Sequence, residues 1–208
     1  AAPTRGPRAA PDVDGDGDLD LYIVNGHISG DTARDYDTQY WRHDIYTGTS
    51  QGDPVLAPYF RSLQTKQLGA GESQGGLEKN RLFLNQSARS FVETGYLMGV
   101  ALEEDCRCAV SDDLDGDGKL DLVLTTFKTR PRLQQALHLF PNVTEDAGHW
   151  FGVRLRESGP GCSPLGAKVI LITESGKQIR TIVSGDSYRS QHAPTAHFGL
   201  GTATAGKS

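Results

Sequence analysis

Short apolar segments recur along the chain between clusters of turn residues, and this spacing is typical of β-strands. Residues 19–24 and 120–125 are brief, rich in Leu, Ile and Val, and bounded by turn residues. A long amphipathic helix would instead repeat apolar residues every three to four positions. With 25 glycines and 10 prolines among 208 residues, the pattern predicts an all-β fold.

The C-terminal part of the chain predicts a small β-domain of its own. Apolar and polar residues alternate from Phe151 to Leu155, and residues 169–172 form a continuous apolar run. The turn residues Ser175 and Gly176 lie between two expected strands, so residues 167–184 are predicted to form a hairpin. We expect a small β-sandwich or barrel-like domain packed against the preceding part of the chain.

The segment from His27 to Lys79 lacks a clear hydrophobic period, and we interpret residues 27–79 as a long insertion between strands. Glycines are frequent between Gly69 and Gly76. An insertion of this size is either functional or a packed surface excursion. Its pair Tyr40-Trp41 would then anchor a partner or fasten the insertion to the core. The aromatic residues of the segment are Tyr36, Tyr40, Trp41, Tyr46, Tyr59 and Phe60.

Two acidic loops of the same pattern, DVDGDGDLD at residues 12–20 and DLDGDGKLD at residues 113–121, predict two calcium sites. Carboxylates at loop positions 1, 3, 5 and 9 can converge on one hard cation that prefers six to eight oxygen ligands. Position 6 is Gly17 or Gly118, which permits a sharp turn, and position 7 offers a backbone carbonyl, so that Asp18 and Lys119 are both acceptable. The predicted carboxylate ligands are Asp12, Asp14, Asp16 and Asp20 in the first loop and Asp113, Asp115, Asp117 and Asp121 in the second.

These loops differ from EF-hand loops at their C-terminal ends. Position 12, where an EF-hand needs a bidentate Glu, is Ile23 in the first loop and Leu124 in the second. Each loop leads into an expected strand, whereas an EF-hand loop leads into a helix. The alternative interpretation is a pair of solvated Asp-Gly turns. The repetition of the motif in the same strand context favours a metal site.

The acidic charge of the chain is concentrated in the two loops. The formal net charge is −5, from 26 acidic residues and 21 Lys and Arg. The loops hold nine of the acidic residues and one basic residue, Lys119, which leaves 17 acidic and 20 basic residues outside them. The remaining basic residues are scattered, so the sequence carries no signature of nucleic-acid binding. No apolar run approaches the length of a membrane span.

Three cysteines, Cys106, Cys108 and Cys162, are too few for a disulfide scaffold. A bridge from Cys106 or Cys108 to Cys162 is plausible in an oxidising compartment, and three unpaired thiols are an equally good interpretation. Asn85 and Asn142 begin glycosylation sequons, with coincidence as the alternative.

The order of motifs resembles two known families. An Asp loop, an apolar strand, the segment NRLFLN at residues 80–85, a Phe-Val-Glu strand and Gly99-Val100 resemble the FG-GAP/VCBS repeat, which implies four-stranded blades of a β-propeller with Ca²⁺ in the Asp loops. The later segments resemble the ASPIC/UnbV domain, and the whole arrangement is similar to the cartilage acidic protein family. The ASPIC/UnbV-like segments are residues 148–155, 165–169, 178–180, 185, 188–191 and 197–201.

From this resemblance we expect propeller-like repeats over residues 1–147, an ASPIC/UnbV-like domain over 148–201 and a tail over 202–208. One or two blades cannot close a ring, because closed propellers have about four to eight. The chain is therefore expected to be a piece of a longer protein, or to have its sheet edges covered by a partner.

The sequence favours a non-enzymatic function. Ser190, His192, His197 and Asp186 lie close in sequence, but the chain has no nucleophile elbow, zinc-protease helix or phosphate-binding loop. His149 and His197 fit the ASPIC/UnbV-like pattern, so structural hydrogen bonding is the expected role of both.

We therefore predict a calcium-binding protein-interaction module, secreted, extracellular or periplasmic, with a protein partner. Two alternatives remain open. One is an accessory or catalytic subunit of a biosynthetic pathway, which the UnbV resemblance raises. The other is a structural subunit of a larger complex.

Overall fold

The computed structural model describes residues 8–32, 42–67, 73, 75–87, 89–128, 132–145, 147–157, 159–174, 176–185 and 187–202, with the backbone alone at 42 and 63–67. The described residues are predominantly β, which confirms the predicted class. Several residues singled out in the sequence lie outside this part of the chain, namely Tyr36, Tyr40, Trp41, Gly69, Ser175 and Asp186.

The first sheet is antiparallel and has the strand order β1-β2-β3-β4. Its strands are β1 (Arg8–Ala9), β2 (Leu21–Ile23), β3 (Arg81–Asn85) and β4 (Phe91–Glu93). The first acidic loop connects β1 to β2, and residues 24–80 connect β2 to its neighbour β3. The insertion therefore lies between two paired strands.

The second sheet repeats this arrangement around the second acidic loop. It has the antiparallel order β5-β6-β7, with β5 (Asp105–Asp112), β6 (Asp121–Lys128) and β7 (Gln134–Phe140). The second loop connects β5 to β6 as the first connects β1 to β2. The described residues form these two sheets without closing a ring, and the propeller-blade interpretation stays a prediction.

The two sheets share one hydrophobic core. Tyr22 and Leu82 of the first sheet and Leu122 and Leu124 of the second are buried in a single cluster. A polar network crosses the same core: the Tyr22 hydroxyl donates to the Val100 carbonyl at 2.6 Å and accepts from Asn80 Nδ2 at 3.0 Å. Most buried polar groups in protein interiors have such a partner.

The C-terminal strands form two further two-stranded sheets. The pair β9 (Lys168–Thr173) and β10 (Gly176–Thr181) is antiparallel, which confirms the predicted hairpin. The strand β8 (His149–Arg154) pairs with β11 (Thr195–Gly201). Ile182, Ala196 and Phe198 form their small core. These pairs pack together as small sheets, and the described residues show no closed barrel.

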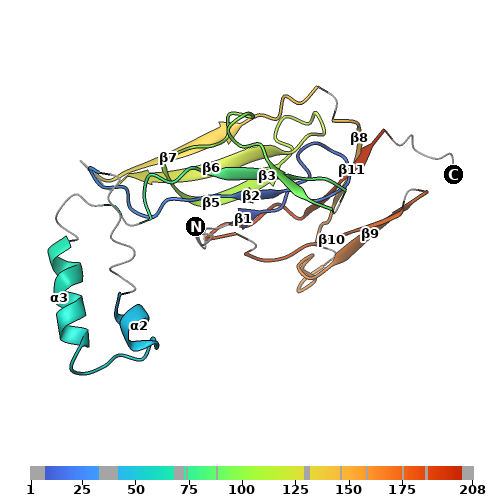
Figure 1. Ribbon diagram of the computed structural model, residues 1–208. Coiled ribbons are helices and arrows are strands. Elements are labelled where there is room, and N and C mark those ends of the chain that lie inside the picture. The colour runs from blue at the N-terminus through green and yellow to red at the C-terminus, as the bar shows by residue number, and fades with distance from the viewer. Residues whose placement is uncertain are drawn as a thin grey trace.

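Two helices lie inside the insertion, and the hydrophobic pattern did not predict them. They are α2 (Arg42–Thr47) and α3 (Ala57–Gln67), which project away from the strands in Figure 1. A usable signal was present at Asp53-Pro54, because the Asp53 carboxylate accepts from the backbone N–H of Val55 and Leu56 ahead of α3, as an N-terminal cap does. Among the described helices none is long and apolar enough to span a membrane.

The two helices pack on each other through aromatic side chains. His43 and Tyr46 of α2 contact Phe60 of α3, with ring centroids 5.6 and 6.3 Å away. Phe60 is buried by these contacts, whereas Ile45 and Tyr46 are 72% and 75% exposed. This part of the insertion is thus a packed excursion that still presents apolar side chains to solvent.

All three cysteines are free thiols, so the interpretation as unpaired thiols holds. Cys106 is buried and accepts a hydrogen bond from Asn80 Nδ2, and burial raises the pKa of its thiol to about 11. Cys162 is exposed and Cys108 half-buried.

Replacing Tyr22 by Phe should destabilise the protein. Tyr22→Phe removes the hydroxyl and leaves the Val100 carbonyl and an Asn80 N–H without this partner in the core, a loss of about 1–3 kcal/mol. Urea unfolding measures it. The matched change Tyr96→Phe alters a 73% exposed residue and should cost less than about 0.5 kcal/mol. Equal stability of the two variants would contradict the role of the network.

Candidate metal centres

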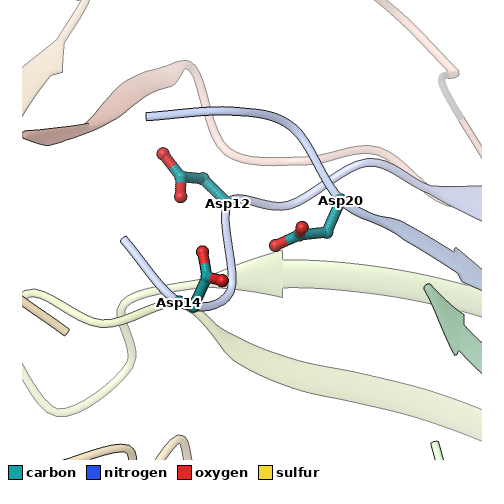
Figure 2. Close-up of side chains that lie close together, drawn as sticks. All are labelled: Asp12, Asp14 and Asp20. Atoms are coloured by element: carbon teal, nitrogen blue, oxygen red, sulfur yellow. The ribbon is translucent and has the colours of Figure 1, made fainter. Parts of the chain in front are cut away.

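Three carboxylates of the first acidic loop converge. Asp12, Asp14 and Asp20 each place one oxygen within 4.8 Å of the others (Figure 2). Asp12 and Asp20 are each only 2% exposed. The turn that brings them together needs Gly17 at φ +99°, a conformation that favours glycine, as the sequence predicts for position 6.

The second loop gathers a different trio. Asp113, Asp115 and Asp117 place their oxygens within the same 4.8 Å, and Gly118 at position 6 has φ +90°. This cluster is more open than the first, because Asp115 and Asp117 are exposed and Asp113 is half-buried. The two loops therefore offer similar carboxylate ligands, which are more buried in the first loop and more exposed to solvent in the second.

Some predicted ligands lie outside these trios. Asp16 is exposed and its Oδ1 accepts from the Asp18 backbone N–H at 2.8 Å. Asp121 is buried, and its two oxygens accept backbone hydrogen bonds. The Lys119 ammonium forms an ion pair with Asp117 Oδ2 at 3.1 Å. The roles of the Asp18 and Lys119 carbonyls remain predictions.

The position 9 carboxylate has the same structural role in both loops. One of its oxygens accepts from the N–H of loop position 2, and the other accepts from an Asn at the end of the next strand or just beyond it. In the first loop Asp20 accepts from Val13 at 2.7 Å and Asn85 at 2.8 Å, and in the second Asp121 accepts from Leu114 at 3.0 Å and Asn142 at 2.7 Å. The position 9 side chain thus links three parts of the chain: the start of its loop, the strand that follows the loop and the end of the next strand.

The remaining loop carboxylates share a second pattern. Position 1 accepts from the N–H of position 6, position 3 from that of position 5, and position 5 from that of position 7. The acceptors are Asp12, Asp14 and Asp16 in the first loop and Asp113, Asp115 and Asp117 in the second. The repetition seen in the sequence is therefore also a repetition of hydrogen bonds.

Asn85 and Asn142 use the atoms that a glycan would occupy. Asn85 Nδ2 donates to the Leu19 carbonyl at 3.1 Å, and Asn142 Nδ2 donates to the Val13 carbonyl at 2.7 Å. Both asparagine side chains therefore donate hydrogen bonds to carbonyls of the first acidic loop. This structural role favours coincidence as the explanation of the two sequons.

The electrostatics of the two loops differ. The pKa of Asp20 is raised to about 6, mainly by burial and also by the neighbouring Asp14 and Asp12, against the lowering effect of two backbone N–H donors. Burial also raises the pKa of Asp12 and Asp14. In the second loop the Lys119 backbone N–H and ammonium lower the pKa of Asp117. The first loop therefore carries less well compensated negative charge.

Residues that are distant in the sequence contact the first loop. The Gly199 N–H donates to Asp12 Oδ2 at 3.0 Å, and the Arg180 guanidinium lies 3.6 Å from the same oxygen. The Gly201 N–H donates to the Gly15 carbonyl at 2.8 Å. Arg180 and Gly199 were not predicted as partners of the loop, because no local pattern signals a contact between segments so distant in the sequence.

The same C-terminal strands contact the second loop. His197 Nε2 lies 2.7 Å from the Gly118 carbonyl, which confirms the expected structural hydrogen bonding of this histidine. The Trp150 ring stacks on His197, with centroids 5.7 Å apart and planes 9° apart. The β8–β11 pair thus reaches both loops.

Ser190 shows no geometry of an activated nucleophile. Its Oγ is buried and has no hydrogen-bond partner in the described part of the chain, so no histidine base is bonded to it. Asp186 lies outside the described residues.

Comparison with known proteins places the family match in the C-terminal part of the chain. Residues 159–208 match the family described as ASPIC and UnbV. Cartilage acidic protein 1 of Mus musculus is 39% identical over 106 residues, which cover 50% of this chain and 16% of that protein. The Homo sapiens protein of the same name is 39% identical over 106 residues, covering 50% of this chain and 15% of its own length. The matched part of the chain thus spans less than a fifth of these relatives.

Removing the Arg180 charge should destabilise the metal-free protein most. Arg180→Gln leaves the buried Asp12 carboxylate without this cation, at a cost of about 3 kcal/mol in EDTA. With excess CaCl₂ the loss should shrink, since a bound cation would neutralise Asp12. Chemical denaturation under both conditions measures the difference. Arg156→Gln, at an exposed position, is the control. An equal loss with and without CaCl₂ would contradict this account of Asp12.

The raised pKa of Asp20 predicts a pH dependence of stability in EDTA. The folded carboxyl binds its proton more tightly than the unfolded one, whose ordinary pKa is 3.8. Its contribution is therefore present below pH 3.8 and is lost as the pH rises through about 6. The Tm of the wild type should fall over this window relative to Asp20→Asn, which cannot titrate there. Parallel pH profiles of the two proteins would show that Asp20 has no raised pKa.

Proposed function

We propose that the chain is a non-enzymatic, calcium-binding interaction module of an extracellular or periplasmic protein, with one Ca²⁺ in each acidic loop. The observation that carries this proposal is the convergence of carboxylates in two loops that share one hydrogen-bond pattern. The candidate ligand atoms in both clusters are oxygens of Asp side chains, and hard oxygen ligands are those that Ca²⁺ prefers.

The charge of the first loop supports a divalent cation there. Asp12 and Asp20 are buried beside the half-buried Asp14, and Arg180 supplies one positive charge near Asp12. Buried carboxylates without full compensation are costly. Bound Ca²⁺ would supply the missing positive charge. In this proposal Asp12, Asp14 and Asp20 hold the ion, and Asp16 and the Asp18 carbonyl complete the ligand set.

In the second loop Asp113, Asp115 and Asp117 would hold the ion, with the Lys119 carbonyl and Asp121 as the further predicted ligands. Lys119 already shields Asp117 through its ammonium. We therefore expect the second site to bind Ca²⁺ more weakly than the first, because less negative charge remains to be neutralised.

The extracellular location rests on the similarity to proteins called cartilage acidic protein 1. Extracellular calcium modules need only weak sites, with Kd of about 10⁻⁴–10⁻³ M. The interaction role is supported by the helical part of the insertion, where four large apolar side chains are exposed. They are Ile45, Tyr46, Val55 and Tyr59. The same exposure fits the second candidate function, a subunit of a larger complex.

Calorimetric titration of the EDTA-treated protein with CaCl₂ tests the proposal, and about two equivalents of Ca²⁺ should bind. Asp14→Asn should remove one binding event and Asp115→Asn the other, whereas Glu174→Gln, an exposed acidic residue of the β9–β10 turn, should leave both. Ca²⁺ at about 100 times its Kd should add about 2.7 kcal/mol of stability per site. No heat of binding and an unchanged Tm would refute the calcium sites.

A further inference from the structure

We propose that the two acidic loops form the surface on which the C-terminal strands β8 and β11 dock. Cation binding to the loops and docking of these strands would then stabilise each other. The inference rests on the proposed calcium sites. In it, His197 and Gly199 are positioning residues, because they act on the loops without being ligands.

At the first loop, Asp12 connects the candidate cation site to β11. One oxygen of this carboxylate accepts from Gly17 within the loop, and the other accepts from Gly199 on β11. The neighbouring contact from the Gly201 N–H to the Gly15 carbonyl holds the same stretch of β11 against the loop. A cation that fixes Asp12 would therefore also fix the acceptor on which β11 depends.

At the second loop the coupling runs through the backbone of Gly118. Its N–H donates to Asp113 Oδ2 at 3.1 Å, and its carbonyl lies 2.7 Å from His197 Nε2. A single residue thus connects a candidate ligand on one side to β11 on the other. The Trp150 ring of β8 lies over the same glycine, stacked on His197.

The fit between the strands and the loops leaves no room for side chains. A Cβ atom added to Gly118 would overlap the Trp150 ring, and one added to Gly199 would collide with Asp12 Oδ2. Gly116, two residues away from Gly118 in the same loop at φ +82°, has open space around its Cβ position. In the structure these contacts occur together with the loop conformation in which the carboxylates converge.

Two equilibria that require the same loop conformation must be coupled, and the coupling is reciprocal. A loop ordered by a cation offers the docking surface, and a docked domain orders the loop for the cation. Coupling between two sites typically changes affinity by about 5-fold to 150-fold.

The first test uses the full chain with Trp41→Phe, so that Trp150 is its only tryptophan. Titration with CaCl₂ should change the Trp150 emission with the same midpoint as Ca²⁺ binding at the second loop, the calorimetric event that Asp115→Asn removes. His197→Ala should weaken Ca²⁺ binding at the second loop by about fivefold or more. His197→Gln, which keeps an N–H donor, should restore much of the affinity. Lys177→Ala, at an exposed position of β10, should have no effect.

The second test compares Gly118→Ala with Gly116→Ala. Both place a side chain at a positive φ in the same loop, but only the first meets Trp150. Gly118→Ala should lose the Trp150 response and bind Ca²⁺ at least about fivefold more weakly than Gly116→Ala.

The coupling would be overturned if His197→Ala bound two Ca²⁺ normally, the two glycine variants had equal affinities and Trp150 did not respond. That result would leave the calcium sites intact. Absence of any Ca²⁺ binding to the wild type would overturn both proposals.

Discussion

The burial of several carboxylates in one small volume is the constraint around which the rest of this structure is arranged. Asp12 and Asp20 are almost wholly removed from water, with Asp14 beside them, and Arg180 is the cation that the described residues place against this group. Like charges at such separations repel strongly where little water screens them. The loop carboxylates accept from the backbone N–H of Val13 within the loop and from those of Asn85 and Gly199, which are distant in the sequence.

The position 9 aspartate links each acidic loop to the sheet beside it. Asp20 joins the start of its loop to the end of β3, and Asp121 joins its loop to Asn142, just beyond β7, in the same way. In the first loop the same carboxylate also belongs to the group of converging side chains, so that Asp20 is both a candidate metal ligand and a hydrogen-bond acceptor for β3. The C-terminal strands then pack across both loops through Gly199 and His197.

Features determined by neighbouring residues could be predicted from the sequence. The spacing of Asp and Gly indicated the convergent loops, and apolar runs around Gly176 indicated the β9–β10 hairpin. The helix α3 was missed because its residues lack a hydrophobic period, although Asp53 marked its start. The contacts of Arg180 and Gly199 with Asp12 could not be foreseen, because they depend on how distant segments pack. Asp16 and Asp121 were predicted as ligands from the same spacing; they lie outside the two groups of converging carboxylates, and their role as ligands stays a prediction.

Amide hydrogen exchange of the full chain, measured by mass spectrometry with EDTA and with CaCl₂, tests the central claim most directly. If the acidic loops support the C-terminal strands, CaCl₂ should slow exchange in both loops and in residues 195–201 together, although β11 contributes no ligand. Slower exchange in the loops with unchanged exchange in β11 would show that the domain docks independently of the loops. Unchanged exchange throughout would contradict the account at its base.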